Sequence, residues 1–217
     1  MALYAQLTDA DTSIGIWKME EEEAELLTRL PQAVSEGVER YKAPHRRLEW
    51  LSVRLLLLTL LHREESDEPL IGYSPSGAPY LLDGSKAISI SHTKGYVAVM
   101  LTPPAQKPGL DIEQWGDRVC KVAPRFLRED EVTPIYHDSP VAALLVHWSA
   151  KEALYKALDE QEAVDFKAHL RLFPFAMATE GEMEAQEYRS LAQRRYRMAY
   201  RLYPDFVLTW VKGPWPV

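Results

Sequence analysis

A short segment near the middle of the chain alternates apolar and acidic residues. It reads Leu110-Asp111-Ile112-Glu113. Because successive side chains of a β-strand point to opposite faces of a sheet, this alternation predicts a strand whose two carboxylates share one face and whose apolar residues enter a core. Magnesium is usually held by one or two protein carboxylates together with phosphate and water oxygens. The acidic face is therefore a candidate magnesium site.

A second segment predicts a helix that adds a third acid. Ser139 and Pro140 are typical of a helix start, and apolar residues follow at helical spacing. These residues are Val141, Leu144, Leu145, Trp148, Tyr155 and Leu158. Glu152 and Lys156 fall on the same apolar stripe, where a charged group needs a partner or a ligand. An ordinary Glu–Lys salt bridge within the helix is the alternative, but the stripe and the acidic strand together favour a site.

The rest of the chain predicts an α+β fold in two unequal halves, residues 1–104 and 105–217. The apolar segment 48–61 is interrupted by charges and is shorter than the roughly 20 residues of a membrane span, so we expect a core helix over residues 46–62. Further helices are expected at 20–30 and around 128–131. Strands are expected at 79–82, 87–91, 96–101, 170–173, 195–203 and 206–211.

Composition limits the possible classes of protein. A chain of 217 residues with 47% hydrophobic content can bury a substantial core. Its net charge of −7 argues against a general nucleic-acid binder, which normally needs a basic surface. The single cysteine, Cys120, excludes an internal disulfide framework and suits a reducing compartment. No secretory signal is visible at the start, so we expect a cytoplasmic protein that neither spans nor binds a membrane.

Five short motifs, taken in order, resemble those of the 4'-phosphopantetheinyl transferase superfamily, in particular its larger monomeric type. They are Gly77–Leu81, Ser89–Thr93, Gly109–Glu113, Arg125–Leu127 and Trp148–Lys156. Each motif is weak alone, but their joint occurrence in this order over most of the chain is specific. The resemblance implies two pseudo-twofold related lobes, each an antiparallel sheet packed with a long helix, with coenzyme A bound in the cleft between them.

The resemblance also implies an activity. It is the magnesium-dependent transfer of the 4'-phosphopantetheine group of coenzyme A to a serine of an apo acyl or peptidyl carrier protein, as in fatty acid biosynthesis, with release of 3',5'-ADP. Asp111, Glu113 and Glu152 would hold magnesium. Glu152 would also be a candidate base for the serine proton, and Lys156, with Lys151 nearby, would meet phosphate charge.

Coenzyme A contacts are expected in the first half of the chain. By resemblance, Ser91 and His92 would contact a phosphate, and Gly77 and Pro79 would supply a close backbone approach and a rigid turn. Arg47 borders the leucine-rich helix and is a candidate for buried pairing or phosphate contact. A lone histidine at a strand end is otherwise more often a structural residue.

One position departs from the family pattern. Ala78 stands where many relatives have a lysine beside coenzyme A. Lys86, Lys94 or Arg40 would have to replace that cation, or coenzyme A would bind less tightly.

The segment Arg125–Arg128 is a candidate docking patch for an acidic carrier protein, because it combines two cations with two apolar residues. The alternative is that Phe126 and Leu127 belong to the core and that the arginines pair with the acids that follow.

Two other functions remain open at this point. A different magnesium enzyme acting on phosphate esters would share the three acids, but it has no reason to contain the other motifs. A catalytically retired homologue would bind carrier protein or coenzyme A without transferring anything, and it would be expected to lose acids that are all present here.

Overall fold

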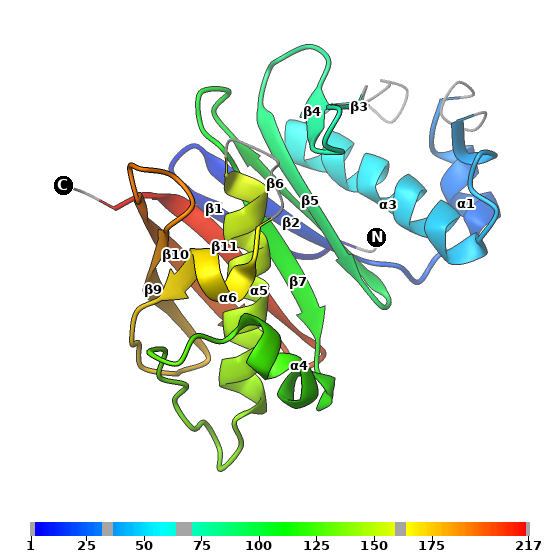
Figure 1. Cartoon of the computed structure of the whole chain (residues 1–217). Coiled ribbons are helices and arrows are strands. Elements are labelled where there is room, and N and C mark those ends of the chain that lie inside the picture. Colours follow the sequence, from blue (N-terminus) through cyan, green and yellow to red (C-terminus); the bar gives the residue numbers. More distant parts are fainter. Residues whose placement is uncertain (1–2, 32–36, 64–70, 159–163, 216–217) are drawn as a thin grey trace. The chain divides into compact units, whose positions relative to one another are not determined.

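The computed structural model describes residues 3–31, 37–63, 71–158 and 164–215. They divide into two compact units, Met1–Gln106 and Lys107–Val217, which we call the N-terminal and C-terminal units. Each unit contains an antiparallel sheet packed with helices, so the predicted α+β class is confirmed (Figure 1). The pseudo-twofold relation between the halves stays a prediction.

The N-terminal unit has a four-stranded sheet in the order β1-β2-β6-β5. Its strands are β1 (Leu3–Asp9), β2 (Thr12–Lys18), β5 (Ala87–Thr93) and β6 (Tyr96–Thr102), and β3 (Ile71–Tyr73) pairs separately with β4 (Pro79–Leu81). The helices are α1 (Glu23–Thr28) and α3 (Pro44–Leu61). The leucine-rich side of α3 packs on β2 and β6 and forms the core of this unit, as the apolar segment predicts.

The hairpin β1–β2 was not expected from the sequence. Its strands pair in antiparallel register from Asp9 with Thr12 back to Leu3 with Trp17. Tight hairpin turns need positive φ angles, which Gly and Asn usually provide. Here Ala10 adopts φ 48°, so the turn has no glycine or asparagine to mark it.

The C-terminal unit has a five-stranded sheet in the order β7-β11-β10-β9-β8. The strands are β7 (Leu110–Gln114), β8 (Leu170–Leu172), β9 (Glu180–Glu187), β10 (Arg195–Leu202) and β11 (Phe206–Pro214). Helix α5 (Val141–Ala157) packs across β7 and β11, and α4 (Arg118–Phe126) and α6 (Phe166–His169) lie beside it (Figure 1). The strand predictions for 170–173, 195–203 and 206–211 are confirmed to within a few residues.

Two expectations for the C-terminal unit are wrong. The helix expected around 128–131 is instead α4, which begins ten residues earlier and ends at Phe126. Residues 128–131 form a turn in which the Glu131 carboxylate accepts the backbone N–H of Arg128. Helix α5 is buried on most sides rather than along one stripe, because the sheet covers one side and α4 and α6 cover another.

None of the helices in the described ranges is both long enough and apolar enough to cross a membrane.

Candidate functional site

Strand β7 presents its two acids to helix α5. Asp111 pairs in register with Thr209 of β11, and directly opposed residues share one face of an antiparallel sheet. The buried Thr209 hydroxyl is hydrogen-bonded to the hydroxyl of Ser149 on α5 at 2.8 Å, which fixes that face as the one toward the helix. Glu113 is two residues along and shares the face. The predicted alternation is confirmed, with Leu110 and Ile112 buried on the opposite side.

Gly109 allows β7 to begin close against α5. A Cβ atom at this position would lie 2.0 Å from the carbonyl oxygen of Ala153 and 2.9 Å from the Cβ of Ala157. Only a residue without a side chain fits there. The glycine therefore sets how closely the acidic strand approaches the helix that contains Glu152.

Lys156 of α5 binds the first acid of the strand. Its ammonium donates to Asp111 Oδ1 and to the carbonyl oxygen of Leu110, both at 2.9 Å. Asp111 is buried, whereas about a quarter of the lysine side chain is exposed. The pair joins the beginning of β7 to the last turn of α5.

Trp148 of α5 binds the second acid. Its indole Nε1–H donates to Glu113 Oε1 at 2.7 Å. Burial raises the pKa of Glu113, and the neighbouring Asp111 carboxylate raises it further, while the indole hydrogen bond and Lys156 oppose the rise.

Glu152 is the third acid of this group. Burial raises its pKa to about 7, with further increases from the charges of Asp111 and Glu113 and an opposing effect of Lys156. The three acids therefore interact electrostatically across the β7–α5 packing. A carboxylate with a pKa near neutrality can accept a proton at physiological pH, which is the requirement for a general base.

The three acids match magnesium in the chemistry of their donors. Hard carboxylate oxygens are what this ion prefers, and a bound cation would relieve the mutual repulsion that raises the pKa of Glu113 and Glu152. Within the described ranges, however, no three His, Cys, Asp or Glu side chains are already gathered in a metal-binding arrangement. In this arrangement Lys156 provides the positive charge beside Asp111.

Lys151 does not join this group. Its side chain is fully buried and its ammonium donates to Glu131 Oε2 at 2.8 Å and to the carbonyl oxygen of Phe126 at 2.6 Å. A lysine in the interior of the unit with these partners is not positioned to meet a phosphate. The expected contact between Lys151 and coenzyme A is replaced here by a buried ion pair.

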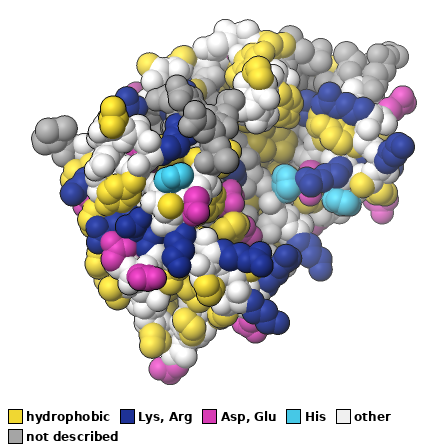
Figure 2. Space-filling view, in the orientation of Figure 1, with side chains coloured by type: hydrophobic (Ala, Val, Ile, Leu, Met, Phe, Trp, Pro, Cys, Tyr) yellow, Lys and Arg dark blue, Asp and Glu magenta, His cyan; other side chains and the backbone are white. Residues whose placement is uncertain are grey.

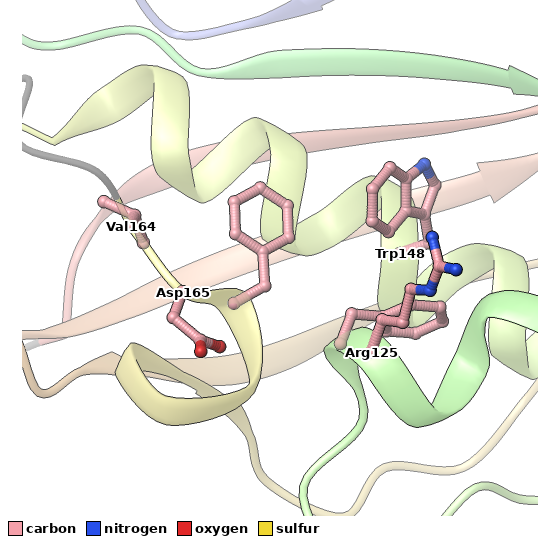
Figure 3. A pocket seen from close by; sticks show the side chains of 6 residues that line it. Arg125, Trp148, Val164 and Asp165 are labelled. Atoms are coloured by element: carbon pink, nitrogen blue, oxygen red, sulfur yellow. The ribbon is translucent and has the colours of Figure 1, made fainter.

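Two cavities flank the indole of Trp148. One, of about 440 Å³, lies between the end of α4 and the start of α6 (Figure 3). The other, of about 550 Å³, lies between α4 and the end of β7 and includes Glu113 and Trp115 in its lining. Arg125 lines both.

The segment Arg125–Arg128 does not form one exposed patch. Phe126 is a core residue, 1% exposed, and Arg128 is held by Asp130 at 2.9 Å and by the carbonyl oxygen of Ala168 at 3.0 Å. The expectation of an exposed Phe126 anchor is wrong, because α4 turns this side chain toward α5. Arg125 is exposed, and its side chain makes no hydrogen bond or ion pair with any residue in the described ranges.

The residues expected to contact coenzyme A lie in the N-terminal unit. Ser91 is buried on β5, and the next residue, His92, is exposed. Gly77 adopts φ +84° in a turn that its N–H closes on Ser74, and Pro79 opens β4.

Arg46 lies beside His92. Its Nη1 donates to His92 Nε2 and to Glu49 Oε2, both at 2.9 Å, and these residues line a cavity of about 140 Å³ with Tyr41 and Trp50. Arg47, the predicted contact, points elsewhere and binds Glu23 of α1 at 2.8 Å. This ion pair is the first of the two roles expected for Arg47, and its contact with a phosphate stays a prediction.

The comparison with known families gives the decisive observation. Residues 107–211, close to half of the chain, match the family model of the 4'-phosphopantetheinyl transferase superfamily. Residues 107–211 form a domain of this superfamily. The match begins just before β7 and ends within β11, so it includes the strand and the helix that hold the three acids. No curated protein matches the chain.

Proposed function

We propose that this superfamily member transfers the 4'-phosphopantetheine group of coenzyme A to a serine of an apo acyl or peptidyl carrier protein and requires magnesium. One observation supports the proposal. The carboxylates of Asp111, Glu113 and Glu152 interact electrostatically beside Lys156, within the part of the chain that matches the superfamily.

Each residue of this group has a proposed role. Asp111, Glu113 and Glu152 would hold the magnesium ion, which when bound supplies positive charge at the pyrophosphate. Lys156 would add charge at the leaving phosphate. Glu152, with its pKa of about 7, is the candidate base.

The proposed reaction is an in-line substitution at phosphorus. The serine oxygen forms a bond to the phosphorus that bears pantetheine, and the bond between that phosphorus and the oxygen of the leaving 3',5'-ADP breaks. The serine proton passes to the carboxylate of Glu152. Placing the serine and the pyrophosphate in line would supply much of the rate increase, because the reacting groups are already oriented.

Coenzyme A contacts are proposed in the N-terminal unit at Ser91, His92, Gly77 and Pro79. Arg46 is added to this set because it lies beside His92 over a small cavity, and it is our candidate for the cation that Ala78 lacks. Each arginine has an acidic partner in this structure, Glu49 for Arg46 and Glu23 for Arg47, so phosphate contact by either one requires it to share or release that carboxylate.

Mass spectrometry of an apo carrier protein after incubation with coenzyme A and magnesium tests the proposal. Transfer adds the mass of phosphopantetheine to the carrier, and Asp111→Asn should abolish this addition because it removes a charge that the magnesium site needs. Glu129→Gln, which changes an exposed acid of the same unit, should transfer normally. Consumption of coenzyme A with an unmodified carrier would indicate another phosphate-ester enzyme, and binding without any reaction would indicate a retired homologue.

A further inference from the structure

The C-terminal unit contains a buried ion pair to which the proposed reaction assigns no role. Lys151 and Glu131 both have side chains that are 0% exposed, and their charged atoms lie 2.8 Å apart. A buried pair of this kind adds little stability over apolar residues of the same volume, because both charges lose their hydration. Stabilisation of the fold therefore does not explain why this ion pair is present.

The pair connects four segments of the unit. The Lys151 ammonium also donates to the carbonyl oxygens of Phe126, at the end of α4, and Phe166, at the start of α6, at 2.6 and 3.4 Å. The Glu131 carboxylate accepts the backbone N–H of Leu172, the last residue of β8, at 2.7 Å. The ion pair thus fixes α4, α6 and β8 against helix α5.

The two residues whose carbonyls bind Lys151 are also the aromatic neighbours of Trp148. The ring of Phe126 lies 5.2 Å from the indole and that of Phe166 lies 5.5 Å from it, between centroids. All three line the cavity of Figure 3, where the indole projects from α5 between the ends of α4 and α6. The rotamer of Trp148 is therefore limited by two rings that the buried lysine holds through their main chains.

The indole also contacts the acidic strand, so its position affects the orientation of Glu113. Its N–H is the donor to Glu113 Oε1 at 2.7 Å. Groups that bind the ligands of a metal from outside orient those ligands and raise the affinity of the site.

We propose that Lys151 and Glu131 are positioning residues for Glu113, acting through Phe126, Phe166 and the Trp148 indole. The orientation of Glu113 is an inference from the contacts of the unit itself. Its consequence for magnesium rests on the proposed function.

The position of the indole N–H can be measured without magnesium or substrate. Trp148 Nε1–H gives its own signal in a ¹H–¹⁵N spectrum of the full chain, assigned by its loss in Trp148→Phe, and Glu113→Ala gives the signal of the indole without its acceptor. The double variant Lys151→Met/Glu131→Gln removes both buried charges and leaves neither unpaired. We expect its Trp148 signal to move toward the position found in Glu113→Ala.

Two further variants keep the test decisive. Met183→Ala shortens a core side chain on β9 and controls for loss of stability, so its Trp148 signal should stay in place. Phe166→Leu removes one ring beside the indole while the main-chain carbonyl and the ion pair remain. The lost ring changes the chemical shift by itself, so this variant is judged by the exchange of the Trp148 indole N–H with water, which should become faster, as in Glu113→Ala. An unmoved signal in the folded double variant would overturn the proposal. If the double variant does not fold, an unchanged exchange rate in Phe166→Leu would overturn it.

Magnesium binding measured by calorimetry connects the inference to the site. The folded double variant should bind magnesium at least ~10-fold more weakly than the unaltered chain, as is usual for residues that support metal ligands, whereas Met183→Ala should bind normally. An unaltered chain that binds no magnesium would contradict the proposed function but not the indole result. Normal magnesium affinity together with a displaced indole signal would show that Glu113 is not a ligand whose orientation matters.

Discussion

Glu152 is the residue whose protonation the structure changes most clearly in the candidate site. Its pKa rises from 4.5 to about 7, so the folded protein keeps this proton to a higher pH than the unfolded chain does. The free energy of unfolding should therefore fall as the pH rises from about 4.5 through about 7, because ionisation then favours the unfolded chain.

Glu152→Gln should remove this decrease in the free energy of unfolding with rising pH. At pH 4, unfolding of the variant and of the unaltered chain in denaturant, with a chelator present, should cost the same free energy. At pH 8 the glutamine variant should be more stable by up to about 3 kcal/mol, since one pKa unit corresponds to about 1.36 kcal/mol, and solvent screening of this partly exposed side chain reduces the gain. A constant difference between the two proteins at all pH values would show that folding does not raise the pKa of this carboxyl.

The same variant should be a poor enzyme. If Glu152 accepts the serine proton, Glu152→Gln should lower kcat by at least ~10²-fold, within the usual range for general acid–base catalysis. A gain in stability together with a loss of turnover is what we expect when an acid is kept at an unfavourable position for its chemistry.

At the scale of elements, the contact between β7 and α5 determines the spacing of the candidate site. Gly109→Ala should disturb it, because the new Cβ would lie 2.0 Å from the backbone oxygen of Ala153, and backbone cannot move aside as a flexible side chain can. We expect a lower melting temperature and weaker magnesium binding. Gly116→Ala is the matched control, since nothing lies within 4 Å of its added Cβ. Equal melting temperatures for the two variants would contradict the close packing.

Local patterns predicted the elements that they determine. The alternation of Leu110–Glu113 predicted β7 and its acidic face. The strands expected at 195–203 and 206–211 form the hairpin β10–β11, in which the Tyr203 N–H donates to the carbonyl oxygen of Phe206. The hairpin β1–β2 was not predicted, because its turn has Ala10 at positive φ instead of a glycine or asparagine. Helix α4 was not predicted, because Pro124 lies inside it and proline usually ends a helix.

The parts of the candidate site that the sequence did not predict depend on contacts between distant residues. Lys151 is adjacent to Glu152 in the chain, yet its environment is set by Glu131, twenty residues earlier. Nothing in the spacing of Lys151 indicates that partner. The choice between Arg46 and Arg47 likewise depends on where β5 places His92 against α3.

At the scale of the whole molecule, charge bears on the partner. The chain has a net charge of −7, and Figure 2 shows its Lys and Arg side chains interspersed with acidic and hydrophobic ones. Arg125 is exposed at the edge of both cavities beside Trp148. An acidic carrier protein would need such a local positive region to approach an acidic enzyme.

Arg125→Glu should therefore raise KM for the carrier protein, with a smaller effect at high salt and little change in KM for coenzyme A. Arg128→Glu is the matched comparison, because its guanidinium is already bound to Asp130 and to the carbonyl oxygen of Ala168. Arg128→Glu should therefore lower the stability of the protein, and its effect on KM for the carrier protein should be smaller than that of Arg125→Glu. If Arg125→Glu leaves KM for the carrier unchanged at low ionic strength, docking occurs elsewhere on the surface.

The strand order of the C-terminal unit also governs when the candidate site can form during synthesis. Among the strands of the described ranges, β7 lies at the edge of its sheet and pairs only with β11, which begins at Phe206. A nascent chain on the ribosome therefore exposes Asp111 and Glu113 on an unpaired strand until β11 has left the exit tunnel. The site therefore forms only after β11 has been synthesised. A translation product that stalls or ends before β11 would lack the site, even if its earlier segments had folded.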